Sequence, residues 1–365
     1  MKTKEFSQHS ILNTQSFSRR YPAEWEKQRA TWLSWPHNEK EWGKDRIEGS
    51  DSKGIREFFE ELIIKILRFQ DVNLVFANEG LLNATEKKYP SIFHNTKFKC
   101  KKIIIPNNDI WIRDYGPFFL EAMDGKDKKS LILDFEFNAW GEKFPPWNLD
   151  NDFPKQLALY SGSAIESYPI VMEGGSLEFS GDGIIMTTEQ CLLNKNRNPK
   201  LNKEQIESIL KSTFNIEEII WLKRGLEGDH TDGHIDDVAR FADPRKVLIC
   251  KSNNKHDGNY KHLNESIQYL KGWKNSKTGD KLEVIELPMP DRMEIKDERL
   301  PNSYANFIFV NGGVIVPTFN CPSDKVALNI FKKLFPDKEI VDINCSLLIE
   351  EGGGLHCMSK QEPLI

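Results

Sequence analysis

Four segments of the chain concentrate the residue types that carry chemistry. They span 108–117, 173–176, 229–237 and 351–357, and they are rich in glycine, tryptophan, histidine and acidic residues. Cys357 closes the last segment, shortly after a run of three glycines. Glycines let a backbone approach a ligand closely, and a nucleophilic thiol has to be accessible and ionisable. The pattern therefore makes Cys357 the candidate nucleophile, although burial as a small hydrophobe is the commoner fate of a free cysteine.

His234 and Asp236 stand two residues apart in the third segment. In an extended chain both side chains would point to the same face and could converge on one ligand. The Asp232-Gly233 pair favours a turn instead. A metal site built from His230, His234 and a neighbouring aspartate is a further alternative, but Asp-Gly between the histidines disfavours the helix that such spacing requires. We therefore expect no metal here.

Asp114 lies in the first segment, after Arg113 and before Gly116-Pro117. It could form a surface salt bridge at a turn, or it could be a functional carboxylate at a strand end, backed by Trp111. Two carboxylates from separate segments, Asp114 and Asp236, would match the planar fork of N–H groups on a guanidinium ion. Carboxylates, a histidine and a thiol together indicate attack on the central carbon of a guanidinium or amide group.

Composition limits the classes of protein that could carry this chemistry. The 365 residues are 39% hydrophobic and 29% charged, with 50 Lys+Arg against 55 Asp+Glu and a formal net charge of −5. A mildly acidic chain without a basic block argues against nucleic-acid binding. No apolar run approaches the ~18 residues of a membrane span, and residues 1–10 have no signal-peptide core. We expect a cytoplasmic protein without membrane or nucleic-acid partners.

Hydrophobic patterns predict the elements that must position these residues. Helices are expected over 53–70, 203–214, 261–273 and 323–335, and strands over 72–76, 102–105, 131–137, 183–187, 219–222, 246–250, 282–287 and 307–316. The helices ending at Phe214 and Phe335 are each followed by a strand and then by a segment with glycine and histidine. The similarity fits a repeat of ~60 residues, which would gather the loops at one end of the assembly.

The four segments, in this order, resemble those of the agmatine deiminase and bacterial peptidylarginine deiminase-like family of guanidine-modifying enzymes. The resemblance extends over about 21–363, and the further matching stretches are 22–26, 31–36, 137–141, 187–194 and 311–317. It implies an α/β fold of the pentein type, a five-bladed propeller of ββαβ-like units with pseudo-fivefold symmetry. It also implies one catalytic domain over 1–365, with 1–20 as an N-terminal extension, and neither a metal nor another cofactor.

The resemblance also implies roles for individual residues. Cys357 matches the family's nucleophile and His234 its general acid and base. Asp114 and Asp236 match the carboxylates that bind the guanidinium group. Glu173 matches the acid that orients the histidine or the substrate. The reaction would proceed through a covalent thiouronium adduct on the cysteine, which water then hydrolyses.

Further residues concern the rest of the substrate. Trp111 and Gly354 are expected to contact it, and Trp140 could provide an apolar wall. An arginine substrate would also need a cation for its α-carboxylate, because an unpaired buried charge is costly. Arg240 and Lys143 are the candidates for that cation.

The function that the resemblance implies is hydrolysis of agmatine to N-carbamoylputrescine and ammonia, a step of putrescine formation. A deiminase for free or peptidyl arginine is the nearest alternative. An amidinotransferase, a guanidino-ligand binder without catalysis and a zinc hydrolase are more distant ones. Leu355, Asp237 and Lys360 stand where agmatine-specific members often differ, so the choice of substrate and the oligomeric state stay open.

Overall fold

A computed structural model describes residues 19–49, 54–94 and 97–365. The predicted N-terminal extension over 1–20 lies outside the described residues except for Arg19 and Arg20, which form β1. Lys53, the first residue of a predicted helix, also lies outside them. No helix of the described part is long and apolar enough to cross a membrane. The cytoplasmic location stays a prediction.

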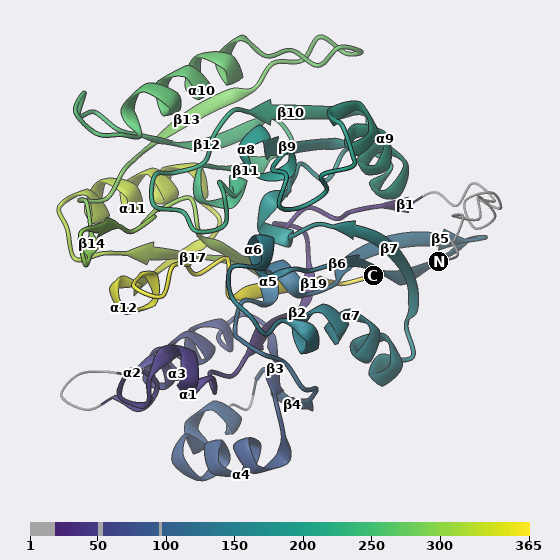
Figure 1. The fold of residues 1–365 in the computed structure, drawn as a ribbon, viewed down its shortest axis with the longest axis vertical. Helices are drawn as coiled ribbons and strands as arrows, with labels where there is room; N and C mark the ends of the chain where they lie inside the picture. Colours follow the sequence, from purple (N-terminus) through teal and green to yellow (C-terminus); the bar gives the residue numbers. More distant parts are fainter. Residues whose placement is uncertain (1–18, 50–53, 95–96) are drawn as a thin grey trace, which may run out of the picture.

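One strand pattern recurs in five sheets of the described residues. Two strands pair antiparallel, one or more helices follow, and a third strand then pairs parallel to the second. Such crossovers place helices over the sheet faces. The helices α3, α7, α9, α10 and α11 lie at the periphery in Figure 1, whereas α5, α6 and β19 lie near its centre. A sixth, two-stranded sheet pairs β14 (Glu294–Ile295) with β15 (Glu298–Arg299).

The first two sheets contain the chain's early strands and one late strand. The order of the first is β19-β2-β3-β4 (Ser359–Pro363, Gln28–Ser34, Asp71–Phe76, Cys100–Ile104), and its connections hold α1 (Glu39–Trp42), α2 (Lys44–Glu48), α3 (Ile55–Ile66), α4 (Glu79–Lys88) and η1 (Pro90–Phe93). The order of the second is β1-β5-β6-β7 (Arg19–Arg20, Phe118–Asp124, Asp127–Glu136, Ala164–Val171), preceded by α5 (Ile112–Tyr115) and crossed by α6 (Ala139–Glu142) and α7 (Asn148–Ser161).

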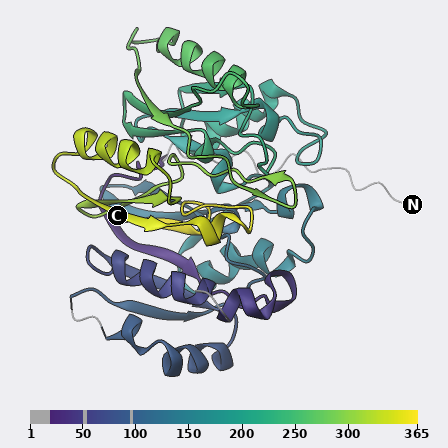
Figure 2. The ribbon, with the colours of Figure 1, turned by 90° about the vertical axis from the view of Figure 1, so that its left-hand side faces the viewer.

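The other three sheets follow in chain order. The third has the order β10-β9-β8 (Glu218–Leu222, Ile184–Thr188, Glu178–Phe179), with η2 (Gly174–Ser176), α8 (Glu189–Leu192) and α9 (Lys203–Phe214). The fourth has the order β11-β12-β13 (Ala239–Asp243, Lys246–Lys251, Glu283–Pro288), with η3 (Ile235–Asp237) and α10 (Tyr260–Gly272). The fifth has the order β16-β17-β18 (Ile308–Val310, Gly313–Thr318, Glu339–Asn344), with α11 (Ser323–Leu334) and α12 (Ser346–Ile349). In Figure 2 the yellow end of the chain lies between the purple helices that follow β2 and the green α10 region.

Local sequence explains why these elements form. Helix α3 buries one stripe, made of Ile55, Phe58, Phe59, Leu62, Ile63 and Ile66, as an amphipathic helix against a core must. Helix α9 begins with a capping box between Asn202 and Gln205, which satisfies backbone N–H groups of its first turn. Strand β12 is apolar and buried over Val247, Leu248, Ile249 and Cys250, as expected for a strand covered on both faces.

The predicted strand over 307–316 is wrong as a single element. It is a hairpin, in which β16 and β17 pair antiparallel around Asn311-Gly312, and Gly312 has a positive φ of 81°. Asn-Gly is a strong turn signal between apolar runs, and the continuous apolar pattern concealed it. The other predicted elements agree with the structure to within a few residues at their ends, except that β6 begins at Asp127.

Candidate active site

Gly175, in η2, lies where three of the predicted site residues meet. A Cβ atom at this position would come within 2.5 Å of His234 Nδ1, 2.9 Å of Asp114 Oδ1 and 3.1 Å of Asp236 Oδ2. The fourth segment joins them through Arg113, whose backbone N–H donates to the carbonyl of Cys357 at 3.1 Å. Segments far apart in the sequence are therefore brought to one place, as predicted.

Asp114 belongs to the short helix α5, not to a strand end as expected. Its Oδ1 accepts a hydrogen bond from the Gly175 backbone N–H at 2.8 Å, and its Oδ2 accepts one from Trp140 Nε1 at 2.9 Å. The carboxyl group is buried, and its pKa is raised to about 6. Burial is the main cause; His234 acts to lower this pKa and Asp236 acts to raise it. A cationic ligand would favour the ionised form.

A tight turn presents His234. Asp232 and Gly233 both have positive φ, 67° and 96°, so the predicted Asp-Gly turn is confirmed. The Asp229 carboxylate accepts the backbone N–H groups of Gly233 and His234 at 3.0 and 2.8 Å. The extended stretch proposed for His234 and Asp236 is not seen, because Asp236 lies in the 3₁₀ turn η3. The two side chains nevertheless converge.

The His234 ring is buried beside acidic groups. Its Nδ1 lies 3.7 Å from Asp114 Oδ1. Neither ring nitrogen has a hydrogen-bond partner among the described residues. Burial opposes the charge of the ring, but Asp114, together with Cys191 and Glu173, outweighs it and raises the pKa of His234 well above its ordinary value. The resting imidazole is therefore held in its protonated form.

The two carboxylate oxygens of Asp236 differ in their hydrogen bonding. His356 Nδ1 lies 2.7 Å from Oδ2, while Oδ1 has no hydrogen-bond partner among the described residues. Burial disfavours the charge, but the hydrogen bond from His356 and the positive charges nearby lower the pKa of Asp236. A buried carboxylate with a free oxygen is able to accept a cationic donor.

The Cys357 thiol lies against carboxylates. Its Sγ is 3.9 Å from Asp236 Oδ2 and accepts a hydrogen bond from Asn306 Nδ2 at 3.3 Å. Asn306 Nδ2 also donates to Asp237 Oδ1 at 2.8 Å. Burial, then Asp236, Asp237 and Asp114, raise the pKa of the Cys357 thiol well above its usual value. The resting thiol is neutral, and a cation among these carboxylates would favour the thiolate.

Glu173 is a further acidic residue close to His234. It is fully buried, and its Oε1 is bound by Arg197 Nε. Its second oxygen has no hydrogen-bond partner among the described residues, and one of its oxygens lies within 4.8 Å of a ring nitrogen of His234. The arrangement suits the orienting role expected of Glu173, and it shows Arg197 as a residue that the sequence did not single out.

Trp111 and Gly354 both border the loop that precedes Cys357. Trp111 packs against Trp42 with ring centroids 5.9 Å apart, and a Cβ at Gly353 would come within 2.4 Å of its ring. A Cβ at Gly354 would come within 2.3 Å of the Asn306 amide. The glycine run therefore lets the loop approach the side chains of Trp111 and Asn306 closely, and its predicted approach to a ligand stays a prediction.

The two cations named for an arginine carboxylate are already engaged. Arg240 is fully buried, and its Nη2 and Nε lie 2.6 and 2.8 Å from Glu24 and Glu178. Lys143 Nζ lies 2.7 Å from Asp232 Oδ1 and donates to the carbonyl of His230. Both cations are thus paired with carboxylates of the protein itself.

Two groups in the described part of the chain have atoms close enough to hold a metal ion. One is Glu173, Cys191 and His234, and the other is Asp236, Asp237 and Cys357. His230, the partner considered for His234, belongs to neither and is exposed. Each group contains a residue that the sequence assigns to a metal-free reaction through the Cys357 thiol. The absence of a bound metal stays a prediction.

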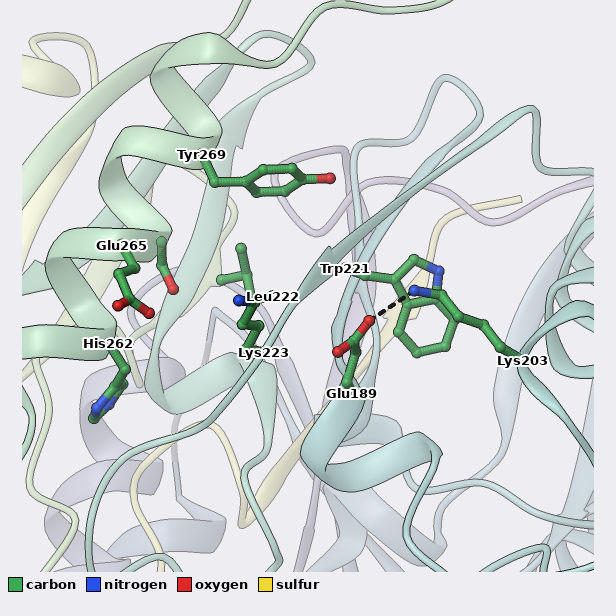
Figure 3. A pocket seen from close by; sticks show the side chains of 9 residues that line it. Glu189, Lys203, Trp221, Leu222, Lys223, His262, Glu265 and Tyr269 are labelled. Atoms are coloured by element: carbon green, nitrogen blue, oxygen red, sulfur yellow. Dashed lines mark hydrogen bonds and ion pairs between the residues drawn. The ribbon is translucent and has the colours of Figure 1, made fainter.

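A groove of about 420 Å³ lies elsewhere, between α10 and the start of α8 (Figure 3). His262, Glu265 and Tyr269 of α10 lie across it from Glu189 and Trp221. It shares no residue with the buried constellation of Cys357, His234, Asp114 and Asp236. The groove is lined by Glu189, Lys203, Trp221, Leu222, Lys223, His262, Glu265, Ser266 and Tyr269.

Known structures place the fold among mixed α/β proteins of the deiminase type. Agmatine deiminase of Enterococcus faecalis aligns with a TM-score of 0.84 at 30% identity, over 94% of this chain and 96% of that one. A Cys-to-Ser variant of C. jejuni agmatine deiminase with substrate bound aligns with a TM-score of 0.83 at 31% identity, over 96% of this chain and 98% of that one.

Sequence comparison identifies the family. The profile of the Porphyromonas-type peptidyl-arginine deiminase family matches residues 20–363. Agmatine deiminase of Pseudomonas putida is 33% identical over 366 aligned positions, which cover 94% of this chain and 95% of that protein. The chain belongs to the Porphyromonas-type peptidyl-arginine deiminase family, as the motifs of the sequence predicted.

Proposed function

We propose that this protein is an agmatine deiminase, which hydrolyses the guanidinium group of agmatine to give N-carbamoylputrescine and ammonia. The observation that carries the proposal is the convergence of Cys357, His234, Asp114 and Asp236 in one buried place. The similarity to agmatine deiminases over most of the chain supports it. The five recurrent sheets also support, as a proposal, the five-bladed propeller that the resemblance implies.

The proposed mechanism uses the thiol as nucleophile. Asp114 and Asp236 bind the guanidinium cation, whose charge offsets theirs and allows the Cys357 thiol to lose its proton to solvent. The thiolate attacks the guanidinium carbon, and protonated His234 gives its proton to the departing nitrogen, so ammonia leaves. His234, oriented by Glu173, then takes a proton from water. The hydroxide oxygen adds to the thiouronium carbon. The C–S bond then breaks, the added hydroxyl group gives its proton to the departing thiolate, and the ureido product is released with the Cys357 thiol restored.

The engaged cations favour agmatine over arginine. Glu24 and Glu178 bind Arg240, and Asp232 binds Lys143, so neither side chain is free to bind an α-carboxylate. Agmatine has an amine in place of that carboxylate and needs no such partner. Free and peptidyl arginine are therefore the weaker candidates.

Product release from three substrates tests the proposal. Ammonia and the ureido group would be measured with agmatine, free L-arginine and a peptide ending in arginine, side by side. We expect kcat/KM to be highest for agmatine, and a strong chelator to leave it unchanged because the mechanism uses no metal. A kcat/KM for arginine equal to or above that for agmatine would contradict the substrate but not the chemistry. Product release from none of the three would contradict both.

A further inference from the structure

His356 bridges two buried carboxylates from opposite sides of its ring. Its Nδ1 lies 2.7 Å from Asp236 Oδ2, and its Nε2 lies 2.8 Å from Glu24 Oε2. All three side chains are buried. An ionised carboxylate only accepts hydrogen bonds, and a neutral imidazole has a single N–H. Both contacts are hydrogen bonds only if the ring carries two protons or if one carboxyl group is protonated.

Arg240 decides between these two possibilities. Its Nη2 lies 2.6 Å from the same Glu24 oxygen that faces His356. Because an arginine in a protein stays charged, it holds Glu24 in the ionised form. Burial disfavours the charge on Glu24, but Arg240 and His356 lower its pKa. Burial also disfavours the charge on Asp236, but His356, His234 and Arg240 lower its pKa. With both carboxyl groups ionised, the extra proton of the group belongs on the ring.

Some neighbours of His356 lower the pKa of its ring and others raise it. Burial, followed by the guanidinium groups of Arg113 and Arg240, lowers the pKa of His356. The two carboxylates oppose this effect from hydrogen-bond distance on either side, and charge-assisted bonds of this length are the strong ones. Neutralising the ring would leave one nitrogen lone pair facing an ionised oxygen at less than 3 Å. The contacts therefore favour the charged ring.

We propose that His356 is a positioning residue: its doubly protonated ring holds Asp236 so that one carboxylate oxygen faces the substrate guanidinium. His356 occupies Oδ2, and Oδ1 has no partner among the residues that the structure describes. The ring also places a positive charge behind Asp236, which keeps that carboxylate ionised beside the thiol. The inference rests on the proposed function for the role of Asp236, but the state of the ring in the resting protein does not depend on it.

Two substitutions separate the orienting contact from the charge. His356→Asn can still donate one hydrogen bond to Asp236 but carries no charge, and we expect KM for agmatine to rise by about tenfold or more with a smaller change in kcat. Glu24→Gln removes the carboxylate behind the ring and allows it to become neutral. Loss of the ring proton at lower pH should then shift the alkaline limb of the kcat/KM profile to lower pH. His262→Asn, in the distant groove, is the matched control and should change neither parameter.

Nuclear magnetic resonance of the resting wild-type protein, with ¹⁵N-labelled histidine, reads the ring directly. We expect two doubly protonated histidines, His234 and His356, at about pH 7, which is above the ordinary pKa of histidine. One of the two signals should disappear in His356→Asn, and both should persist in His262→Asn. A neutral His356 at that pH would overturn the proposal, even if agmatine is hydrolysed. An unchanged KM in a folded His356→Asn variant would also overturn it. If agmatine is not a substrate but the doubly protonated signal of His356 is present, the proposed function fails and the assignment of the ring survives.

Discussion

Cys357 and His234 both hold their protons more tightly than they would in water. Burial and then the surrounding carboxylates favour the protonated thiol. Burial opposes the charge of the imidazole, but Asp114 and other nearby groups outweigh it. The resting pair is then a neutral thiol and an imidazolium, which cannot attack. A guanidinium cation changes the balance for the thiol while leaving the imidazolium ready to donate. The same carboxylates thus bind the substrate and hold the nucleophile inactive until it arrives.

Substitution of the thiol tests the nucleophile. Cys357→Ser should reduce kcat by more than about 1,000-fold, as the loss of a nucleophile does in other enzymes. Agmatine should still bind, because the carboxylates are unchanged, and calorimetry would measure that binding. Cys191→Ser, at a second buried thiol, is the comparison that separates the two cysteines. Turnover of more than a few per cent in Cys357→Ser would exclude the covalent mechanism.

The pH dependence should report Asp114. Its pKa is raised to about 6, so in the free enzyme the carboxylate becomes protonated, and loses its attraction for a cation, as the pH falls through that value. We expect kcat/KM for agmatine to fall on the acid side of pH 6. Bound substrate favours the ionised carboxylate, so the acid limb of kcat should lie at lower pH than that of kcat/KM. Coincident limbs, or a flat kcat/KM profile across this range, would contradict the assignment.

The residues that touch the substrate in the proposal were predictable from sequence, and those that support them were not. Cys357 and Asp114 lie in glycine- and tryptophan-rich motifs whose residue types indicate chemistry. Glu24 and His356 are 332 positions apart, and no local spacing in the sequence indicates that they are in contact. Glu24 belongs to a matching stretch near the start of the chain, and His356 directly precedes the thiol. Their pairing became visible only once the sheets were placed.

At the scale of elements, the site depends on short loops that pack without side chains between them. Gly175 holds η2 against α5 and the His234 turn, and the glycine run holds the Cys357 loop against Trp111 and Asn306. Gly175, Gly353 and Gly354 need the absence of a Cβ, whereas Gly352 has a positive φ of 91°. Close approach therefore explains Gly175, Gly353 and Gly354.

Gly175→Ala tests this packing. The added methyl would lie 2.5 Å from His234 Nδ1, so the ring or η2 has to move. A displacement of about 1 Å of a catalytic group costs on the order of 100-fold in rate, and we expect kcat to fall by that amount. Gly272→Ala is the matched control, because a Cβ there meets nothing within 4 Å. Equal kcat in both variants would show that the site tolerates the shift.

Element prediction succeeded where a pattern was local. The helix over 203–214 was predicted at its observed bounds because its apolar stripe is local in the sequence. The 307–316 hairpin was missed because both of its strands are buried and apolar, so periodicity could not separate them. The antiparallel pairing of β19 with β2 joins residues more than 300 positions apart, and no local pattern carries that information.

At the scale of the whole molecule, Arg240 connects segments that are distant in the chain. It binds Glu24 near the first sheet, Glu178 of β8 and the carbonyl of Phe307 before β16. The sequence suggested Arg240 as a candidate for the substrate's carboxylate, and its contacts show a structural role instead. A buried arginine with two carboxylates stabilises only while all partners are present.

Denaturation of two arginine variants tests that role. Arg240→Met would leave two buried carboxylates without their cation, and we expect the free energy of unfolding to fall by about 3–5 kcal/mol. Arg245→Ala removes the partly exposed ion pairs of Arg245 with Asp182 and Asp280 and should cost less than about 1 kcal/mol. Denaturant titration of both variants gives the two values. A loss for Arg240→Met no larger than that for Arg245→Ala would contradict the buried network.

The pairing of β19 with β2 also has a consequence in time. A ribosome makes β2 before the other members of its sheet, and β19 follows after every other described strand. One edge of β2 therefore stays unpaired until β19 has been synthesised, while the rest of the domain forms. Cys357 arrives with that partner, just before β19. A growing chain could build most of its sheets and still hold no nucleophile, so hydrolytic capability should emerge in a single late event of biosynthesis.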